Sequence, residues 1–138
     1  MFLINDKLFT SLNYSYIVAK IDDNKINLTY NDKILPGVSK HNLTLSLGYS
    51  PIKNFETILS HTYKSSAYAY NDFENNFSQK QEAYHSTDLS FNFKKNNVEL
   101  FAKIQNLFDQ KNGLWVQDNA IYPVNFERTF FAGMKVNF

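Results

Sequence analysis

The chain has 138 residues, of which 43% are apolar and 20% charged, so it is too hydrophobic for a disordered tail and fits one folded unit. Its 14 Lys and Arg residues against 13 Asp and Glu residues leave a formal net charge of +1, which provides no basic field for nucleic acid. The lack of cysteine excludes disulfide frameworks, thiol nucleophiles and Cys-based zinc sites. With four Gly residues, the sequence has no glycine-rich phosphate loop.

The aromatic content is high, with 13 Phe and 9 Tyr residues interleaved with small polar residues. This mixture favours strands. No apolar run approaches the roughly 18 to 20 residues of a membrane-spanning helix, and the apolar stretch 1–4 is too short for a signal peptide. We therefore expect this chain to reach a membrane, if it does so, only as strands.

Six stretches alternate apolar and polar residues with the period of two that indicates a strand with two unlike faces. In chain order they are 8–20, 41–49, 55–68, 87–93, 98–105 and 129–138. The alternation is clearest where Leu43, Leu45 and Leu47 are separated by single polar residues. Two of the stretches are less regular, because Ile17 and Ile58 fall on the polar face. The sequence predicts an all-β fold of about six strands and no helix.

The connections between these strands alternate in length. Segments 50–54 and 94–97 are short and polar, as in tight hairpins, whereas 22–40, 69–86 and 109–127 are long. In an antiparallel meander, all short turns then lie at one end of the sheet and all long loops at the other. Outer-membrane barrels have this topology, with short periplasmic turns and long external loops.

Several separated segments carry a family resemblance. They are Leu12-Asn13-Tyr14-Ser15-Tyr16, Ile34-Leu35-Pro36-Gly37-Val38-Ser39-Lys40-His41, Asn106-Leu107-Phe108-Asp109, Tyr122-Pro123, Arg128-Thr129-Phe130 and Val136-Asn137-Phe138. In their order and spacing they resemble the C-terminal barrel region of TonB-dependent outer-membrane receptors. The resemblance covers nearly the whole chain, although Ser39 replaces a frequent proline and Glu127 a common glycine.

The resemblance implies that residues 1–138 are the last part of a barrel of about 22 transmembrane strands with a plugged lumen. The plug domain and the earlier strands would then lie outside this sequence. It further implies active uptake of a scarce nutrient across the outer membrane, in the first place a ferric siderophore or another iron complex, with no catalysis and no cofactor. The implied partners are outer-membrane lipids, the barrel-assembly machinery, the iron chelate and, through the plug domain, the TonB complex.

A terminal aromatic residue preceded by alternating apolar residues resembles the signal that the barrel-assembly machinery reads in outer-membrane proteins. In this sequence the corresponding residues are Phe130, Met134, Val136 and Phe138. Near the strand ends, Tyr14, Tyr16, Tyr49, Tyr63 and Phe93 have the amphipathic rings that suit the boundary between hydrocarbon and headgroups. Ordinary aromatic packing is the alternative for these rings.

Ligand contacts are expected in the long loops, because loops on a rigid scaffold carry binding. The aromatic candidates are Tyr30, Tyr68, Tyr70 and Trp115, with Phe73 and Phe77 beside them, and the cationic candidates for an anionic siderophore are Lys25, Lys33, Lys80 and Lys111. Loops of this length always contain some aromatic residues and lysines, most of which contact no substrate. The prediction is therefore a set of candidates.

The remaining polar candidates favour structure over chemistry. His41, His61 and His85 lack the close spacing of metal ligands, and no metal site is expected. Ser60, His61 and Asp88 could form a hydrolase triad, but no nucleophile motif surrounds them. Arg128 is expected to make an interior ion pair, for instance with Glu99.

Two other function classes stay open at the level of sequence. A soluble β-barrel binding module would bury Leu43, Leu45, Leu47 and Phe91 inside the barrel. An outer-membrane lipid enzyme would need a nucleophile motif in sequence beyond these residues. Solubility without detergent would favour the first of these alternatives.

Deleting Phe138 tests the assembly signal. In a complete receptor that contains this segment, we expect the deletion to reduce the amount of assembled barrel, because the terminal ring of the signal is lost. Heat-modifiable electrophoretic migration measures the assembled fraction. Unchanged migration would contradict the assignment.

Overall fold

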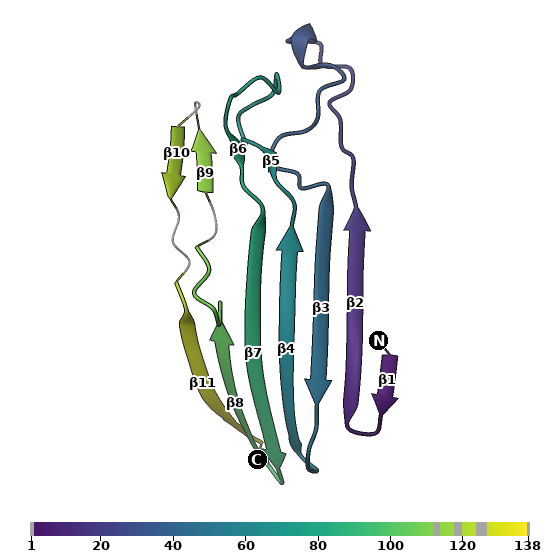
Figure 1. The fold of residues 1–138 in the computed structure, drawn as a ribbon, viewed down its shortest axis with the longest axis vertical. Helices are drawn as coiled ribbons and strands as arrows, with labels where there is room; N and C mark the ends of the chain where they lie inside the picture. Colours follow the sequence, from purple (N-terminus) through teal and green to yellow (C-terminus); the bar gives the residue numbers. More distant parts are fainter. Residues whose placement is uncertain (1, 112–113, 118–119, 124–126, 138) are drawn as a thin grey trace.

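The computed structural model describes residues 2–111, 114–117, 120–123 and 127–137, and within 114–123 it describes the side chain of Val116 alone. In this described part, seven strands form one antiparallel sheet in the order β1-β2-β3-β4-β7-β8-β11 (Figure 1). Their bounds are β1 Phe2–Asn5, β2 Leu8–Tyr16, β3 His41–Tyr49, β4 Phe55–Lys64, β7 Tyr84–Lys95, β8 Val98–Gln105 and β11 Thr129–Val136. Sequential strands are neighbours, so the predicted all-β antiparallel meander is confirmed.

The sheet differs from the prediction at its N-terminal edge. The short strand β1 pairs with β2, and the Lys7 amide donates a 2.8 Å hydrogen bond to Asn5 Oδ1 in the turn between them. We did not expect this strand, because an apolar run of three residues is too short to show a period of two. The structure therefore has one strand more in the main sheet than the six predicted.

Several predicted strand ends were also displaced, among them the end of β7, which continues to Lys95, and that of β11, which stops at Val136. The first long strand ends at Tyr16, since the following residues 19–21 pair with 33–35 of the same loop. The third ends at Lys64, because the chain leaves the sheet and Ala67–Tyr68 pairs with Lys80–Gln81. Strand β7 begins at Tyr84, which places His85 in a strand and not in a loop.

Short turns and long loops lie at opposite ends of the sheet, as predicted (Figure 1). Asn54 and Asn96 have φ angles of 72° and 52° in two of the turns, and Asn tolerates this left-handed region better than most residues. The long loops contain the 3-10 turn η1 (Leu28–Tyr30) and two hairpins, β5 (Ala67–Tyr68) with β6 (Lys80–Gln81) and β9 (Leu114–Gln117) with β10 (Ala120–Pro123). These small elements organise the loop end of the molecule.

The register of the strands separates two faces. Leu12, Leu45 and His61 lie in one row across β2, β3 and β4, and Ser11, Ser46 and Ser60 lie in the next row. Because successive residues of a strand point to opposite faces, the first row belongs to an apolar face and the second to a polar face. The apolar face continues through Leu59, Leu89, Phe91, Ile104, Ala102, Leu100, Phe130 and Met134.

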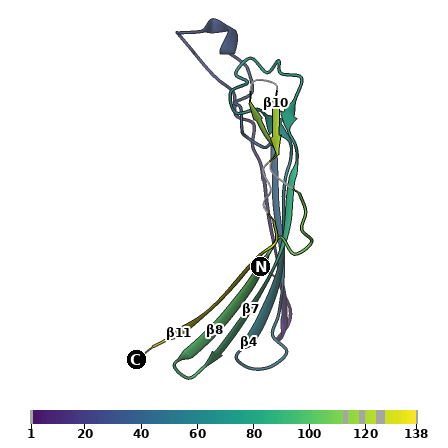
Figure 2. The ribbon, with the colours of Figure 1, turned by 90° about the vertical axis from the view of Figure 1, so that its left-hand side faces the viewer.

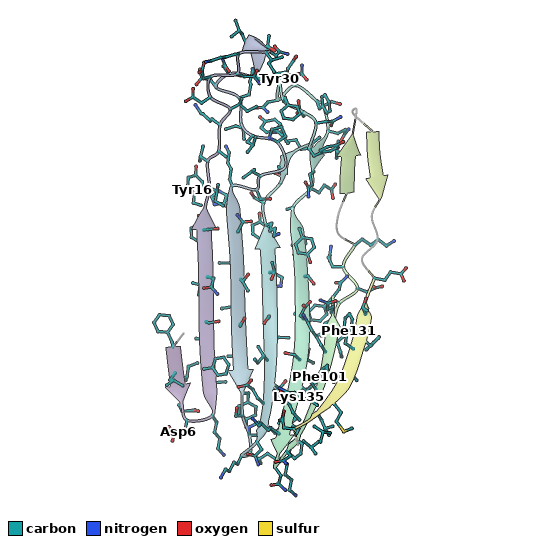
Figure 3. The ribbon with its side chains drawn as sticks, turned by 180° about the vertical axis from the view of Figure 1, so that it is seen from behind. Asp6, Tyr16, Tyr30, Phe101, Phe131 and Lys135 are labelled. Carbon is teal, nitrogen blue, oxygen red and sulfur yellow. The ribbon has the colours of Figure 1, made fainter. Side chains whose placement is uncertain are left out.

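The sheet is curved: toward the turn end β4, β7, β8 and β11 sweep to one side, with β11 displaced furthest (Figure 2). Phe101, Phe131 and Lys135, which share the polar face, are seen on the side toward which these strands bend (Figure 3). Two aromatic rings cover glycines on this face: Phe9 lies over Gly48, and Phe101 over Gly133. The polar face is thus the concave one, and its large rings fit where the facing strand has no side chain.

The apolar face has no covering layer in the described part of the chain. Leu12 is 56% exposed and Phe130 68% exposed, although both belong to long regular strands. The buried apolar residues among those described are Ala67, Ala69 and Val116, all of which lie in the long loops. The sheet therefore carries its hydrophobic residues outward on the convex side, where a water-soluble domain would need a second layer.

No helix in the described residues is long and apolar enough to cross a membrane.

Substituting Gly48 tests the ring-over-glycine packing. We expect Gly48→Val to lower the free energy of unfolding by about 1–3 kcal/mol, because a side chain at this position occupies the space of the Phe9 ring. Urea unfolding followed by far-UV circular dichroism measures the change. The double variant F9A/G48V should recover part of the loss, and Ala132→Val on the apolar face is the matched control. Equal effects of Gly48→Val and Ala132→Val would contradict the packing.

Candidate functional site

The first long loop, residues 17–40, folds back on itself. The Ile21 amide donates to the Lys33 carbonyl at 2.9 Å, and the Leu35 amide donates to the Ala19 carbonyl at 2.9 Å, so the loop begins as an extension of two strands. At its tip, Asn24 Oδ1 accepts from the amides of Ile26 and Asn27. At the tip of the loop these two amides have no main-chain acceptor among the described residues, and the Asn24 side chain takes that place. The two hydrogen bonds stabilise the start of the 3-10 turn that includes Tyr30.

The second long loop, residues 65–83, is organised by Asp72. This side chain is fully buried, and its two carboxylate oxygens accept from the amides of Asn76 at 2.9 Å and Phe77 at 3.3 Å. The Asp72 amide in turn donates to the Ala69 carbonyl at 2.9 Å. A buried carboxylate needs such donors, so the loop folds around this side chain.

Asn75 joins the second loop to the first. Its Oδ1 accepts from the Ile34 amide at 2.7 Å and its Nδ2 donates to the Ile34 carbonyl at 2.9 Å, so one side chain makes both bonds of a β-bridge. A third bond runs from the Gly37 amide to the Tyr68 carbonyl at 2.9 Å. We call the two joined loops, residues 17–40 and 65–83, the loop pair.

The loop pair brings together several aromatic residues that we predicted as ligand contacts. Tyr30 stacks on Phe73, with 5.5 Å between the ring centroids and 29° between the planes, and Figure 3 shows Tyr30 at the outer tip. The Lys80 ammonium lies 4.2 Å from the centroid of the Tyr68 ring. Tyr70 is exposed in the same loop. The side chain of Trp115 lies outside the described residues, although its backbone belongs to β9.

The predicted cationic contacts are dispersed over the loops. Lys25 makes an exposed ion pair with Asp23 at 3.8 Å, which partly neutralises its charge. Lys80 is held by the Tyr68 ring, whereas Lys111 is an exposed residue of the third loop. Of the predicted lysines, Lys80 therefore lies beside a predicted aromatic contact, Tyr68.

The third long loop begins with the Asn106-Leu107-Phe108-Asp109 turn. Asn106 and Asp109 have φ angles of 51° and 52°, and Asn106 Oδ1 accepts from the Gln110 amide at 2.9 Å. The turn is tied to both sides: the Leu107 amide donates to the Thr87 carbonyl at 2.7 Å, and Asp109 Oδ1 accepts from the Arg128 amide at 2.9 Å. This segment fixes where β8 ends relative to β7 and β11.

The ion pair on the polar face differs from the expected one. Asp88 Oδ2 and Lys103 Nζ are 3.0 Å apart, and Asp88 Oδ1 accepts from Ser86 Oγ and from the Asn106 amide, each at 3.1 Å. The predicted pair of Arg128 with Glu99 is wrong. Glu99 lies opposite Lys135 at the turn end of the sheet, whereas Arg128 precedes β11 at the loop end.

The Ser60, His61 and Asp88 triad is not assembled. Ser60 and Asp88 are register partners on the polar face, but His61 lies on the apolar face, because neighbouring residues of a strand point to opposite sides. Its Nδ1 is hydrogen-bonded to Thr87 Oγ1 at 2.9 Å, and Ser60 Oγ is 2.9 Å from Ser46 Oγ. Within the described residues, no group of three His, Asp or Glu side chains could hold a metal ion.

Aromatic residues lie at both ends of the apolar face. At the loop end, the Tyr14 hydroxyl is hydrogen-bonded to His41 Nδ1 at 2.9 Å, and the Tyr16 ring lies 5.0 Å from the same imidazole. Tyr63 contacts His85 one strand pair further along the sheet. At the turn end, Tyr49 and Phe93 lie on the same face. We call the rings at the loop end the aromatic girdle: Tyr14, Tyr16, His41, Tyr63 and His85.

Three of the four residues expected in the assembly signal share the apolar face of the last strand. Phe130, Met134 and Val136 pair with residues of β8 that lie on the same face, and Met134 is 65% exposed. Phe138 lies outside the described residues. The spatial arrangement is thus a row of exposed apolar side chains along β11.

Sequence reasoning missed the residues that join the loops. Asp72 and Asn75 are polar residues in a polar loop, and nothing in their neighbourhood distinguishes them from Asn71 or Asn76. The spacing of an Asp three residues before an Asn in a left-handed conformation is a weak signal of a side-chain-capped turn. It does not indicate the distant partner Ile34.

A family model described as TonB dependent receptor-like, beta-barrel, matches residues 4–107. The chain belongs to this family of TonB-dependent receptor barrels. The match covers the strands β2 to β8 and both members of the loop pair. No curated protein sequence matches the chain significantly.

Several solved structures share the fold of this chain. The ferric citrate transporter FecA in the unliganded form aligns with a TM-score of 0.78 and 20% identity over 96% of this chain. The ferric-catecholate import receptor Fiu from K12 E. coli gives 0.71 and 20% over 98%, and the ferric yersiniabactin uptake receptor FyuA from Yersinia pestis gives 0.72 and 18% over 98%. At such identities the likeness shows the fold. The chain spans 19% to 22% of the length of these three proteins.

Removing the Asn75 side chain tests the loop pair. We expect Asn75→Gly, which keeps the left-handed backbone accessible, to speed hydrogen–deuterium exchange of the Ile34 amide about thirtyfold, because two hydrogen bonds of roughly 1 kcal/mol each are lost. Asn76→Gly is the matched control, since that side chain bonds to Glu74 within its own loop. Equal exchange in both variants would show that other contacts hold the loops.

Proposed function

We propose that this chain is the C-terminal barrel portion of an outer-membrane TonB-dependent receptor that takes up an iron complex, with a ferric siderophore as the leading substrate class. The observation that carries the proposal is the division of one curved meander into a polar concave face and an exposed apolar convex face. Membrane barrels turn their apolar residues outward to lipid. In this placement, the aromatic girdle marks one boundary of the hydrocarbon layer, and Tyr49 and Phe93 mark the other.

The soluble binding module is not favoured. Such a module would bury Leu43, Leu45 and Leu47 inside its barrel, on the concave side. The register instead places them on the convex face, where Leu45 is 46% exposed and Leu47 43% exposed. An apolar convex surface of this extent is suited to lipid and not to water.

In the proposed receptor, residues 1–138 supply strands and external loops, whereas the plug domain and the remaining strands belong to sequence outside this range. Strand edges cannot stay open in hydrocarbon, so the outer edge of β1, the part of β2 beyond Thr10 and β11 would pair with those further strands. Energy from the TonB complex would reach the receptor through the plug. The barrel-assembly machinery would recognise the apolar row of Phe130, Met134 and Val136 together with Phe138.

The loop pair is the proposed place of ligand contact within this chain. Tyr30 and Phe73 present a stacked pair of rings, and Lys80 beside Tyr68 adds a positive charge. Aromatic faces and cations suit the flat, anionic surface of a ferric chelate. Tyr70 in the loop pair and Trp115 in the third loop are further candidates. The receptor would bind and move its substrate without chemical change.

Loop variants test the proposed contacts. In the complete receptor, we expect Y30A/F73A to weaken binding of a ferric tris-catecholate or of ferric citrate, whichever the wild type binds, by about twofold to tenfold, as the loss of one or two aromatic contacts implies. Binding to iron-starved cells is measured with radioactive iron. Ile26→Ala is the control, because this loop side chain is 99% exposed.

Uptake separates transport from surface binding. Cells that carry the receptor should accumulate the bound chelate only when the TonB complex is energised. Two results would overturn the proposed iron uptake. One is accumulation that continues without an energised inner membrane. The other is a wild-type receptor that binds neither the ferric tris-catecholate nor ferric citrate.

A further inference from the structure

A pocket of about 240 Å³ lies at the loop end of the sheet, where β3 begins and β4 ends. Its walls include the side chains of Lys40, His41 and Lys80 and the two serines Ser65 and Ser66, and no carboxylate residue lines it. None of the ligand candidates described above except Tyr68 and Lys80 belongs to this pocket. It combines two positively charged side chains with neutral hydrogen-bond donors.

The walls of the pocket are held by contacts that do not depend on a ligand. Lys80 Nζ lies 4.2 Å from the Tyr68 ring centroid, and this cation–π contact positions its ammonium group. Ser65 Oγ accepts from the His41 amide at 3.2 Å, and the Tyr68 carbonyl accepts from the Gly37 amide at 2.9 Å. The charged groups are thus arranged on a hydrogen-bonded frame between the loop pair and the sheet.

Two other pockets differ from it in charge. A pocket of about 670 Å³ at the turn end includes Asp6 and Glu56 beside its lysines. A pocket of about 310 Å³ on the polar face includes Asp88 and Glu127. Carboxylates in a pocket repel anions and neutralise cations. The pocket lined by Lys40, His41 and Lys80 has basic side chains and no carboxylate, so its charge favours an anion.

The location of the pocket indicates the source of the anion. His41 belongs both to the pocket and to the aromatic girdle, where it contacts Tyr14 and Tyr16 on the apolar face. The pocket therefore lies at the level where lipid headgroups meet the protein, provided that the proposed membrane placement holds. The pocket has room for a phosphate group, and lysine ammonium groups are common phosphate ligands.

We propose that the pocket formed by Lys40, His41 and Lys80 binds a phosphate group, carried by the headgroup of an outer-leaflet lipid. The two ammonium groups neutralise its charge, and the hydroxyls of Ser65 and Ser66 donate hydrogen bonds to its oxygens. The proposal rests on the proposed function for the membrane placement, and it concerns a second ligand, a lipid, whose pocket shares Tyr68 and Lys80 with the proposed chelate contacts.

The experiment compares two lysine pairs in the complete receptor, purified in detergent. Native mass spectrometry titrates the receptor with bis-phosphorylated lipid A, with dephosphorylated lipid A and with inorganic phosphate. We expect K40Q/K80Q to bind bis-phosphorylated lipid A at least tenfold more weakly than the wild type. The control K53Q/K95Q removes the same charge from exposed lysines at the turn end and should bind as the wild type does.

The outcomes are distinct. Loss confined to K40Q/K80Q and to phosphorylated lipid A supports the lipid site, and a parallel loss of inorganic phosphate binding supports the same phosphate chemistry with a soluble source. Equal binding by both double variants, or equal binding of dephosphorylated lipid A, overturns the proposal. Heat-modifiable migration of each variant scores barrel assembly separately, so failure of the proposed membrane placement is distinguished from failure of the pocket.

Discussion

Main-chain hydrogen bonding between neighbouring strands determines where nearly every other feature of this chain lies. The tight turns at 50–54 and 96–97 fix the register, because Asn54 and Asn96 accept the left-handed conformation that such turns require. A slip of one residue would exchange the two faces of a strand. The position of Leu47 on the convex side, and that of Ser46 on the concave side, both follow from this register.

The loop end is stabilised by a different kind of packing. The strands bury few apolar side chains, and the loops are rich in Asn, Asp and Ser. There the order comes from side chains that act as main-chain partners: Asp72 accepts from two amides, and Asn75 completes a bridge to Ile34. Buried polar groups of this kind define one arrangement strictly, because each alternative leaves a donor or acceptor without a partner.

The sequence predicted six of the seven strands of the main sheet, but it did not predict the contacts that join the loops. Alternation of period two is a local signal, so 41–49 and 98–105 were predicted with the bounds that the structure shows. The contact of Asn75 with Ile34 joins residues 41 positions apart and has no local signal. The pair of Arg128 with Glu99 failed for a related reason, since charge complementarity ignores the register that places the two residues at opposite ends of the sheet. Tyr30, Phe73, Tyr68 and Lys80 were all identified from the sequence as loop candidates, but the stacking of Tyr30 on Phe73 and the contact of Lys80 with Tyr68 followed only from the tertiary structure.

The bridge made by Asn75 also has a consequence for the entropy of binding. Two free loops would each lose conformational freedom when a ligand orders them, and that loss reduces affinity. Loops that are already joined have lost part of this freedom during folding, so a molecule that contacts either loop meets a surface that is largely preorganised. A contact at Tyr30 can also restrict the motion of residues near Tyr68, because Ile34 and Asn75 couple the two segments. The amide side chain of Asn75, with the Gly37–Tyr68 hydrogen bond and the Tyr30–Phe73 stacking, thus joins two segments into one surface.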